Sequence, residues 1–203
     1  RKCQGPGHRG PQMQKVKTPR AAYIHVPFCA HRCGYCNFAL VAGRDDLIPS
    51  YLRAIALELA QLAEPQPVDT LYFGGGTPTQ LSPTQFTELV RTVLHWHPLA
   101  DGYEWTVEAN PADVDQPIVD CLASLGVTRI SLGGQSFQER KLQLLERDHQ
   151  RGDIARAVQL ARDANLRVTV DLIFAAPGET LAEWQADVQS AIKLQPDHVS
   201  TYG

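Results

Sequence analysis

The sequence predicts an α/β protein in which six parallel strands, joined by helices, form a partial (β/α)6 barrel. From residue 21 onward, short apolar runs alternate with longer amphipathic segments, which is typical of repeated strand–helix units around a parallel sheet. Chemically unusual residues follow several of the short runs, at the strand ends where such barrels hold their sites. The chain has 203 residues, 43% of them apolar, which suffices for one sizeable core.

The elements are assigned in chain order from this alternation. We predict strands at residues 21–26, 70–73, 104–108, 129–132, 167–173 and 198–202. We predict helices at residues 49–63, 83–96, 116–125, 154–165 and 181–194, with a short extra helix at 139–145. Helix-start signals support three of these: Ser50 follows Pro49, Pro83 follows Ser82 at a first helical position, and Thr180 precedes the last apolar-periodic run. Crossover helices wind right-handed, so all carboxyl strand ends are expected on one rim.

Residues 1–20 are predicted to be a disordered leader, and residues 21–203 the folded domain. Gly and Pro residues interrupt any periodicity in the leader, and apolar residues are few. Met13 is the only methionine, so we expect it to be the natural start, with residues 1–12 an artefact. Gly203 directly follows the last predicted strand without a terminating signal, and we expect the chain to be truncated before a C-terminal domain.

Charge and cysteine content narrow the class of protein. The leader carries six Lys/Arg and no acid, so residues 21–203 hold 13 basic and 22 acidic side chains and sum to −9, which argues against non-specific nucleic-acid binding. No stretch reaches the ~18 apolar residues of a transmembrane segment, and no targeting signal precedes the first strand. Three of the five cysteines fall within eight residues, which favours metal or cluster binding in a reducing compartment. We expect a cytoplasmic location.

The three clustered cysteines, Cys29, Cys33 and Cys36, form a C-x-x-x-C-x-x-C pattern directly after the first predicted strand. Three thiolates this close can bind three irons of one 4Fe-4S cluster and leave the fourth iron open to another ligand. The alternatives are a zinc site that adds His31 to the cysteines, or buried thiols without a metal. The glycine run at residues 74–76, after the second predicted strand, favours the cluster.

Several motifs in order along residues 21–203 resemble the oxygen-independent coproporphyrinogen oxidase family of the radical SAM superfamily. Besides the cysteines, they are residues 23–29 (YIHVPFC), 73–79 (FGGGTPT), 108–111 (EANP), 135–137 (QSF), 171–173 (DLI) and 177–178 (PG). The resemblance implies a radical SAM barrel, in which S-adenosylmethionine chelates the open iron through its amino and carboxylate groups. It also implies an electron donor for the cluster, whose reduction can cleave S-adenosylmethionine to methionine and a 5′-deoxyadenosyl radical.

The resemblance further implies a set of cofactor-binding residues: Tyr23, Phe38, Gly75, Gly76, Thr77, Glu108, Gln135, Arg147 and Asp171. Gln135 and Asp171 suit hydrogen bonds to ribose hydroxyls, and Arg147 can pair with the ligand carboxylate and with Glu108. The alternative for these polar residues is a network of the barrel rim alone.

The other members of the set are expected to shape the pocket. The glycines let the backbone approach the methionine moiety. Tyr23 is expected beside the cluster, and Tyr35 and Phe38 beside the adenine, with core packing as the alternative. We assign no catalytic residue. His25 is expected to be a hydrogen bonder inside the barrel.

Three positions depart from the family pattern. Asn37 stands where an acid is common, Gly134 replaces a valine before Gln135, and residues 175–176 (AA) replace Gly-Leu before Pro177. The second departure loosens the strand end that aims Gln135, and the third removes a glycine near the ribose.

Two branches of the family lead to different functions. HemW-type haem chaperones bind haem and pass it to recipient haemoproteins. The oxygen-independent coproporphyrinogen III dehydrogenase uses the adenosyl radical for oxidative decarboxylation of propionates. Phe38 stands two residues after Cys36, where the dehydrogenase branch has a fourth cysteine and the chaperone branch a phenylalanine. We therefore expect a haem chaperone, with the porphyrinogen dehydrogenase as the alternative and a zinc-stabilised structural domain as a third hypothesis.

Overall fold

The computed structural model describes residues 19–203, so nearly all of the predicted leader, including Met13, lies outside the described residues. The described residues form a six-stranded parallel sheet in the order β1-β4-β5-β6-β7-β8. Its strands are β1 (Ala21–Val26), β4 (Val68–Gly75), β5 (Leu99–Ala109), β6 (Arg129–Gln135), β7 (Arg167–Ile173) and β8 (His198–Tyr202). This confirms the predicted α/β fold with a parallel sheet.

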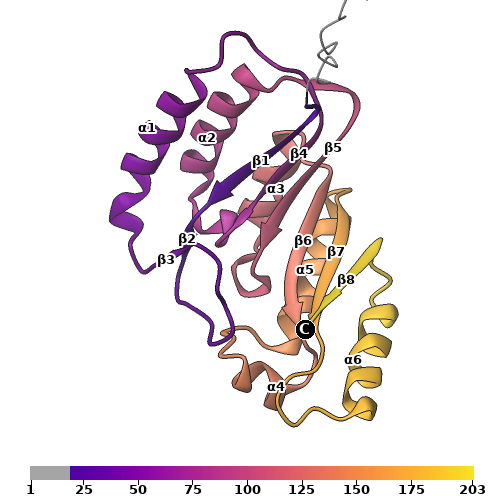
Figure 1. The fold of residues 1–203 in the computed structure, drawn as a ribbon. Helices are drawn as coiled ribbons and strands as arrows, with labels where there is room; N and C mark the ends of the chain where they lie inside the picture. Colours follow the sequence, from indigo (N-terminus) through magenta and orange to yellow (C-terminus); the bar gives the residue numbers. More distant parts are fainter. Residues whose placement is uncertain (1–18) are drawn as a thin grey trace, which may run out of the picture.

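Helices connect consecutive strands and lie around the outside of the curved sheet (Figure 1). They are α1 (Ile48–Leu59), α2 (Pro83–Trp96), α3 (Gln116–Ser124), α4 (Glu139–Leu144), α5 (Arg151–Asp163) and α6 (Leu181–Lys193). The start signals at Ser82 and Thr180 are confirmed, because these side chains each accept a hydrogen bond in a capping box at the N-termini of α2 and α6. Ser50 makes no such cap, because α1 already begins at Ile48 and has Pro49 in its first turn. No helix within residues 19–203 is long and apolar enough to cross a membrane.

Three strands are longer than predicted. The strands that begin at Val68, Leu99 and Arg129 include glycines and polar residues that interrupt the apolar runs. In these segments, hydrogen bonds to the neighbouring strands stabilise an extended conformation that the local residue propensities do not favour. The short pair β2 (Phe28–Cys29) and β3 (Val41–Ala42) was not predicted, since two residues are too few to show an alternating pattern.

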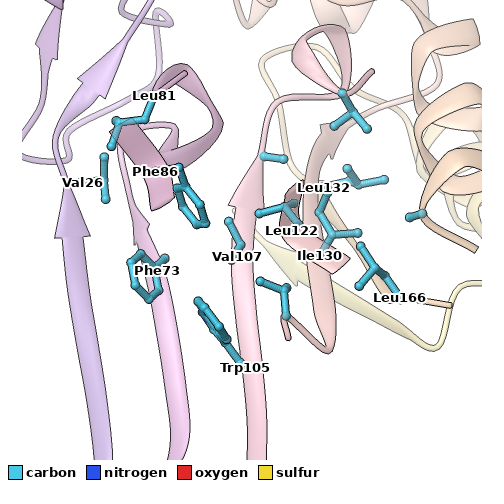
Figure 2. Packing of buried hydrophobic residues seen from close by; sticks show 14 of the residues in the cluster. Val26, Phe73, Leu81, Phe86, Trp105, Val107, Leu122, Ile130, Leu132 and Leu166 are labelled. Atoms are coloured by element: carbon cyan, nitrogen blue, oxygen red, sulfur yellow. The ribbon is translucent and has the colours of Figure 1, made fainter. Parts of the chain in front are cut away.

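The core lies between the sheet and the helices. Figure 2 shows Phe73, Phe86 and Trp105 grouped between β4, α2 and β5, and the ring centroids of Phe86 and Trp105 each lie 5.5 Å from that of Phe73. Burial of one such side chain contributes roughly 1.5–3 kcal/mol. This packing fixes the strands so that their carboxyl ends face a common side.

Two non-glycine residues near these strand ends have left-handed backbone conformations. Gln135 ends β6 with φ +61°, and Ala175 follows β7 with φ +60°. The Cβ of an L-residue costs about 1–2 kcal/mol in this region, whereas glycine adopts it freely. Ala175 occupies one of the positions where the family pattern has glycine, so this departure introduces backbone strain.

We therefore predict that Ala175→Gly stabilises the protein by about 1 kcal/mol, because relief of the strain exceeds the entropy cost of glycine. The matched control is Ala176→Gly, at a buried neighbour whose φ is negative, which should lose about 0.5–1 kcal/mol. Urea unfolding of both variants measures the two free energies. Equal destabilisation by both substitutions would contradict the predicted strain at residue 175.

Candidate functional site

A cavity lies at the carboxyl ends of the strands, and eleven of the twelve predicted site residues line it. They are Cys29, Cys33, Cys36, Phe38, Gly75, Gly76, Thr77, Glu108, Gln135, Arg147 and Asp171. These residues come from β2, the cysteine loop, and the ends of β4, β5, β6 and β7, together with the segment after α4. The parallel sheet thus brings together residues that are up to about 140 positions apart in the sequence.

Tyr23 is the exception. Its side chain is 56% exposed, stacks on Tyr72 and lines a separate hollow between β1 and α1. The Tyr23 hydroxyl lies 3.2 Å from Nδ1 of His25, whose Nε2 lies 2.7 Å from the carbonyl oxygen of Ala39. The hydrogen-bonding role expected for His25 is confirmed, and its bond to Ala39 holds the far end of the cysteine loop against β1.

The cysteine loop is fixed at both ends by backbone hydrogen bonds. The amide of Val41 donates to Pro27 at 2.8 Å, and the amide of Gly43 donates to Cys29 at 3.0 Å. Cys29 is buried, and its Sγ lies 3.4 Å from the hydroxyl of Thr77. Burial raises the pKa of the Cys29 thiol, while the Thr77 hydrogen bond opposes this. Cys33 and Cys36 are partly exposed to the cavity.

The glycine segment passes so close to the loop that side chains are excluded. A Cβ on Gly76 would lie 2.6 Å from the carbonyl oxygen of Phe28 and 2.8 Å from the carbonyl carbon of Pro27. Gly75 has φ +115°, and a Cβ there would lie 2.5 Å from the His25 ring. The amides of Gly76 and Thr77 donate to Val26 and Phe28 at 2.8 and 2.7 Å, which joins β4 to the start of the cysteine loop.

The Glu108 carboxylate, which lines the cavity, is held by two hydrogen-bond donors. Its Oε1 accepts from the Tyr72 hydroxyl at 2.8 Å, and its Oε2 accepts from the Gly75 amide at 2.9 Å. Burial raises the pKa of the Glu108 carboxyl, and these two hydrogen bonds oppose the shift.

Arg147 does not contact Glu108, contrary to our expectation. Its Nη1 donates to Cys33 Sγ at 3.3 Å, and its Nη2 donates at 2.9 Å both to Asn110 Oδ1 and to the Gly133 carbonyl. Asn110 directly follows β5, two residues after Glu108, and its Oδ1 accepts from the guanidinium in place of the Glu108 carboxylate. Arg147 therefore links a cysteine to the ends of β5 and β6.

His149 continues this network in a defined neutral tautomer. The Nε of Arg147 can only donate, so Nδ1 of His149 accepts it at 3.3 Å, and Nε2 carries the hydrogen that is donated to the Gly134 carbonyl at 2.8 Å. Burial and the charge of Arg147 lower the pKa of His149 to about 4. The imidazole is thus uncharged beside the guanidinium.

Gln135 and Asp171 lie at the ends of β6 and β7. Gln135 is only 4% exposed, and its Oε1 accepts from the Tyr202 hydroxyl at 2.7 Å. Asp171 Oδ2 accepts from the Ser131 hydroxyl at 3.0 Å. Burial raises the pKa of the Asp171 carboxyl, and the hydrogen bonds from Ser131 and Ser200 oppose the shift.

Five residues that line the same cavity were assigned no role from the sequence: Asn110, Asp113, Ser131, Asp148 and Tyr202. His31 also lines it and was considered only as a ligand of the alternative zinc site. Asn110 belongs to the EANP motif, so its position in that motif was an available signal. Asp148 directly follows Arg147 and accepts hydrogen bonds from the Asn110 amide at 2.9 and 3.2 Å. Tyr202 is a single polar residue on a short strand, and no local pattern distinguishes it.

The donor set fits an iron–sulfur cluster with a polar ligand. Three thiols face one cavity, and a glycine backbone leaves room where side chains would collide. Within residues 19–203, no three His, Cys, Asp or Glu side chains converge closely enough to hold a single metal ion. A zinc site requires ligands at about 2.0–2.3 Å from one point, whereas thiolates on separate irons stand farther apart.

The sequence profile of the Radical SAM superfamily matches residues 23–191. The chain is 36% identical over 188 residues to a Lactococcus lactis protein named "Heme chaperone HemW", covering 92% of this chain and 49% of that protein. A Synechocystis protein named "Oxygen-independent coproporphyrinogen III oxidase" is 33% identical over 192 residues, covering 92% of this chain and 41% of that protein. The chain spans about half the length of the curated relatives it matches.

A solved structure is similar over the same region. The coproporphyrinogen III oxidase HemN from Escherichia coli, described as a radical SAM enzyme, matches with a TM-score of 0.83 and 26% identity. The match covers 91% of this chain and 44% of that chain.

We predict that Gly76→Ala destabilises the protein by about 1–3 kcal/mol, because the added Cβ meets backbone atoms that cannot rotate away. The matched control is Gly152→Ala in α5, where an added Cβ has nothing within 4 Å and should leave stability unchanged or raise it by up to ~1 kcal/mol. Thermal unfolding followed by circular dichroism compares the two. A Gly76→Ala protein as stable as the wild type would show that the glycine segment is not tightly packed.

Proposed function

Since the chain belongs to the radical SAM superfamily, whose profile matches residues 23–191, we propose that it forms the cofactor-binding part of a HemW-like haem chaperone. The observation that carries the proposal is Phe38, which lines the cavity two residues after Cys36 and is 64% exposed. In the porphyrinogen dehydrogenase branch this position is a cysteine. A phenyl ring offers packing to a planar ligand and no thiol chemistry.

We propose that Cys29, Cys33 and Cys36 hold the 4Fe-4S cluster that the superfamily implies. When bound, the cluster supplies an electron to S-adenosylmethionine at its open iron. The protein's part is to hold the thiolates: Thr77 can donate to Cys29, and Arg147 donates to Cys33. Hydrogen bonds to the sulfur ligands favour the more reduced, more negative cluster.

The polar residues around the cavity are proposed to bind S-adenosylmethionine with the groups that the protein leaves free. The Tyr202 hydroxyl donates to Oε1 of Gln135, so the two Nε2 hydrogens of Gln135 remain as donors to the ligand. Asp171 accepts from the Ser131 and Ser200 hydroxyls, and its carboxylate keeps further lone pairs that can accept from a ribose hydroxyl. Within the described residues, four of the five Arg147 N–H groups have partners, so one hydrogen on Nη1 is available for the ligand carboxylate.

We propose haem as the cargo of the whole protein. This chain covers about half the length of the relatives that it matches. The name "Heme chaperone" of several relatives at 34–37% identity supports this cargo. Recipient haemoproteins and an electron donor for the cluster are the proposed partners. A reducing, cytoplasmic environment is proposed because it would keep the three thiols available for iron.

We predict that Cys29→Ala, Cys33→Ala and Cys36→Ala each abolish stable cluster binding, because each removes one of three iron ligands. Cys121→Ala is the matched control, since Cys121 packs against the core on α3 and does not line the cavity. Iron and acid-labile sulfide per chain, measured after anaerobic reconstitution, give the result. A full cluster in any of the three single variants would refute the assignment of that cysteine.

We also predict that the complete protein binds haem and does not decarboxylate coproporphyrinogen III under anaerobic reducing conditions with S-adenosylmethionine. Haem titration followed by absorption spectroscopy measures binding, and chromatography of the porphyrins measures turnover. Stoichiometric formation of protoporphyrinogen IX with release of 5′-deoxyadenosine would instead establish the porphyrinogen dehydrogenase alternative. The Cys33→Ala protein serves as the control for cluster-dependent turnover.

A further inference from the structure

A cluster of buried ionised side chains lies behind the cavity, outside the site described above. Lys141 of α4 is 6% exposed and Asp187 of α6 is fully buried, and Lys141 Nζ lies 3.1 Å from Asp187 Oδ2. Lys141 also forms an ion pair with Glu179, which follows β7, and lies over the ring of Trp184 at 5.4 Å from its centroid. Burial of such charges is costly unless every one is paired and hydrogen-bonded.

The carboxylate of Asp187 accepts hydrogen bonds from the two residues that directly follow Gln135. Its Oδ2 accepts from the Ser136 hydroxyl at 2.7 Å, and its Oδ1 accepts from the Phe137 amide at 2.8 Å. The Ser136 hydroxyl in turn accepts from the Gln138 amide at 3.0 Å. The carboxylate of Asp187 therefore fixes the turn in which Gln135 adopts its left-handed conformation.

The same cluster holds the end of β7. Lys141 Nζ donates to the carbonyl of Ile173, two residues after Asp171. Glu179 Oε2 accepts from the Ala176 amide at 3.2 Å, directly after the left-handed Ala175. Both strand ends that carry a proposed ribose ligand are thus tied to one group of buried charges.

We propose that Asp187 and Lys141 are positioning residues for the nucleoside half of S-adenosylmethionine, acting through the backbone next to Gln135 and Asp171. The inference rests on the proposed function, since it concerns the ligand of the same cavity. Neither residue lines that cavity, and neither contacts a proposed iron ligand in the described part of the chain. Their effect on ligand affinity is therefore separable from cluster binding.

The decisive variant is Ser136→Ala, because it removes the hydroxyl between Asp187 and the turn and leaves the ion pair with Lys141 intact. Asp187→Ala is less suitable, since it leaves a buried lysine with one carboxylate fewer and threatens folding. We expect Ser136→Ala to weaken S-adenosylmethionine binding about tenfold, the scale of one hydrogen bond to a charged group, with unchanged iron content. Binding is measured by isothermal titration calorimetry on the anaerobically reconstituted chain.

Two controls separate positioning from loss of stability. Arg140→Ala removes an exposed ion pair with Glu183 between the same two helices, at 3.3 Å, and should leave affinity unchanged. Ala157→Gly, at a buried position in the middle of α5, lowers stability by about 1 kcal/mol and should also leave affinity unchanged.

The possible outcomes are distinguishable. A wild-type chain that binds no cluster or no S-adenosylmethionine would overturn the proposed function itself. A Ser136→Ala chain that keeps its iron and binds S-adenosylmethionine as tightly as the wild type would overturn the positioning role alone. Loss of iron in Ser136→Ala, or equal weakening in Ala157→Gly, would show a general structural role and would also overturn the inference.

Discussion

The whole site depends on the parallel hydrogen bonding of six strands. In a parallel sheet every strand ends on the same side, so residues from the ends of β4, β5, β6 and β7 meet although long helices separate them in sequence. The register sets which side chains meet: Glu108 pairs with Ser131, and Asp171 pairs with Ser200. Ser131 itself pairs with Thr169 of β7, so Asp171, two residues farther along the same face, lies within reach of the Ser131 hydroxyl.

A second constraint acts where the cysteine loop meets the sheet. Just after β4, a Cβ on Gly76 would collide with the carbonyl groups of Pro27 and Phe28, and the amides of Gly76 and Thr77 donate to Val26 and Phe28. The loop contains little regular structure of its own, so contacts with its surroundings determine its shape. Arg147 reaches it from the opposite side through Cys33. The three thiols are thus oriented by two parts of the chain that flank the cavity.

The sequence predicted the fold because the fold depends on local signals, and it predicted about half of the residues that line the cavity. Alternating apolar runs gave β1, β7, β8 and α2 with their observed bounds. Of the eleven predicted residues that line the cavity, the cysteines followed from their spacing and the others from what the family resemblance implies. Pair contacts were less predictable. The expected bond between Arg147 and Glu108 depends on how far each side chain extends, and Asn110 lies nearer to the guanidinium. Asp187 lies on an amphipathic helix, where the sequence predicts that a single acidic residue is exposed to solvent. The structure shows that it is buried.

The left-handed conformation of Gln135 limits which sequences can occupy this strand end. Residue 135 has to satisfy both the hydrogen-bonding demand of Tyr202 and a backbone geometry that β-branched side chains avoid. Asparagine and aspartate tolerate that geometry best among residues with a side chain, but both are one methylene shorter. A substitution at this position therefore has to meet two requirements, the hydrogen bond with Tyr202 and the left-handed backbone conformation. Threonine meets neither requirement, because its hydroxyl lies much closer to the backbone than the Gln135 amide and its Cβ is branched.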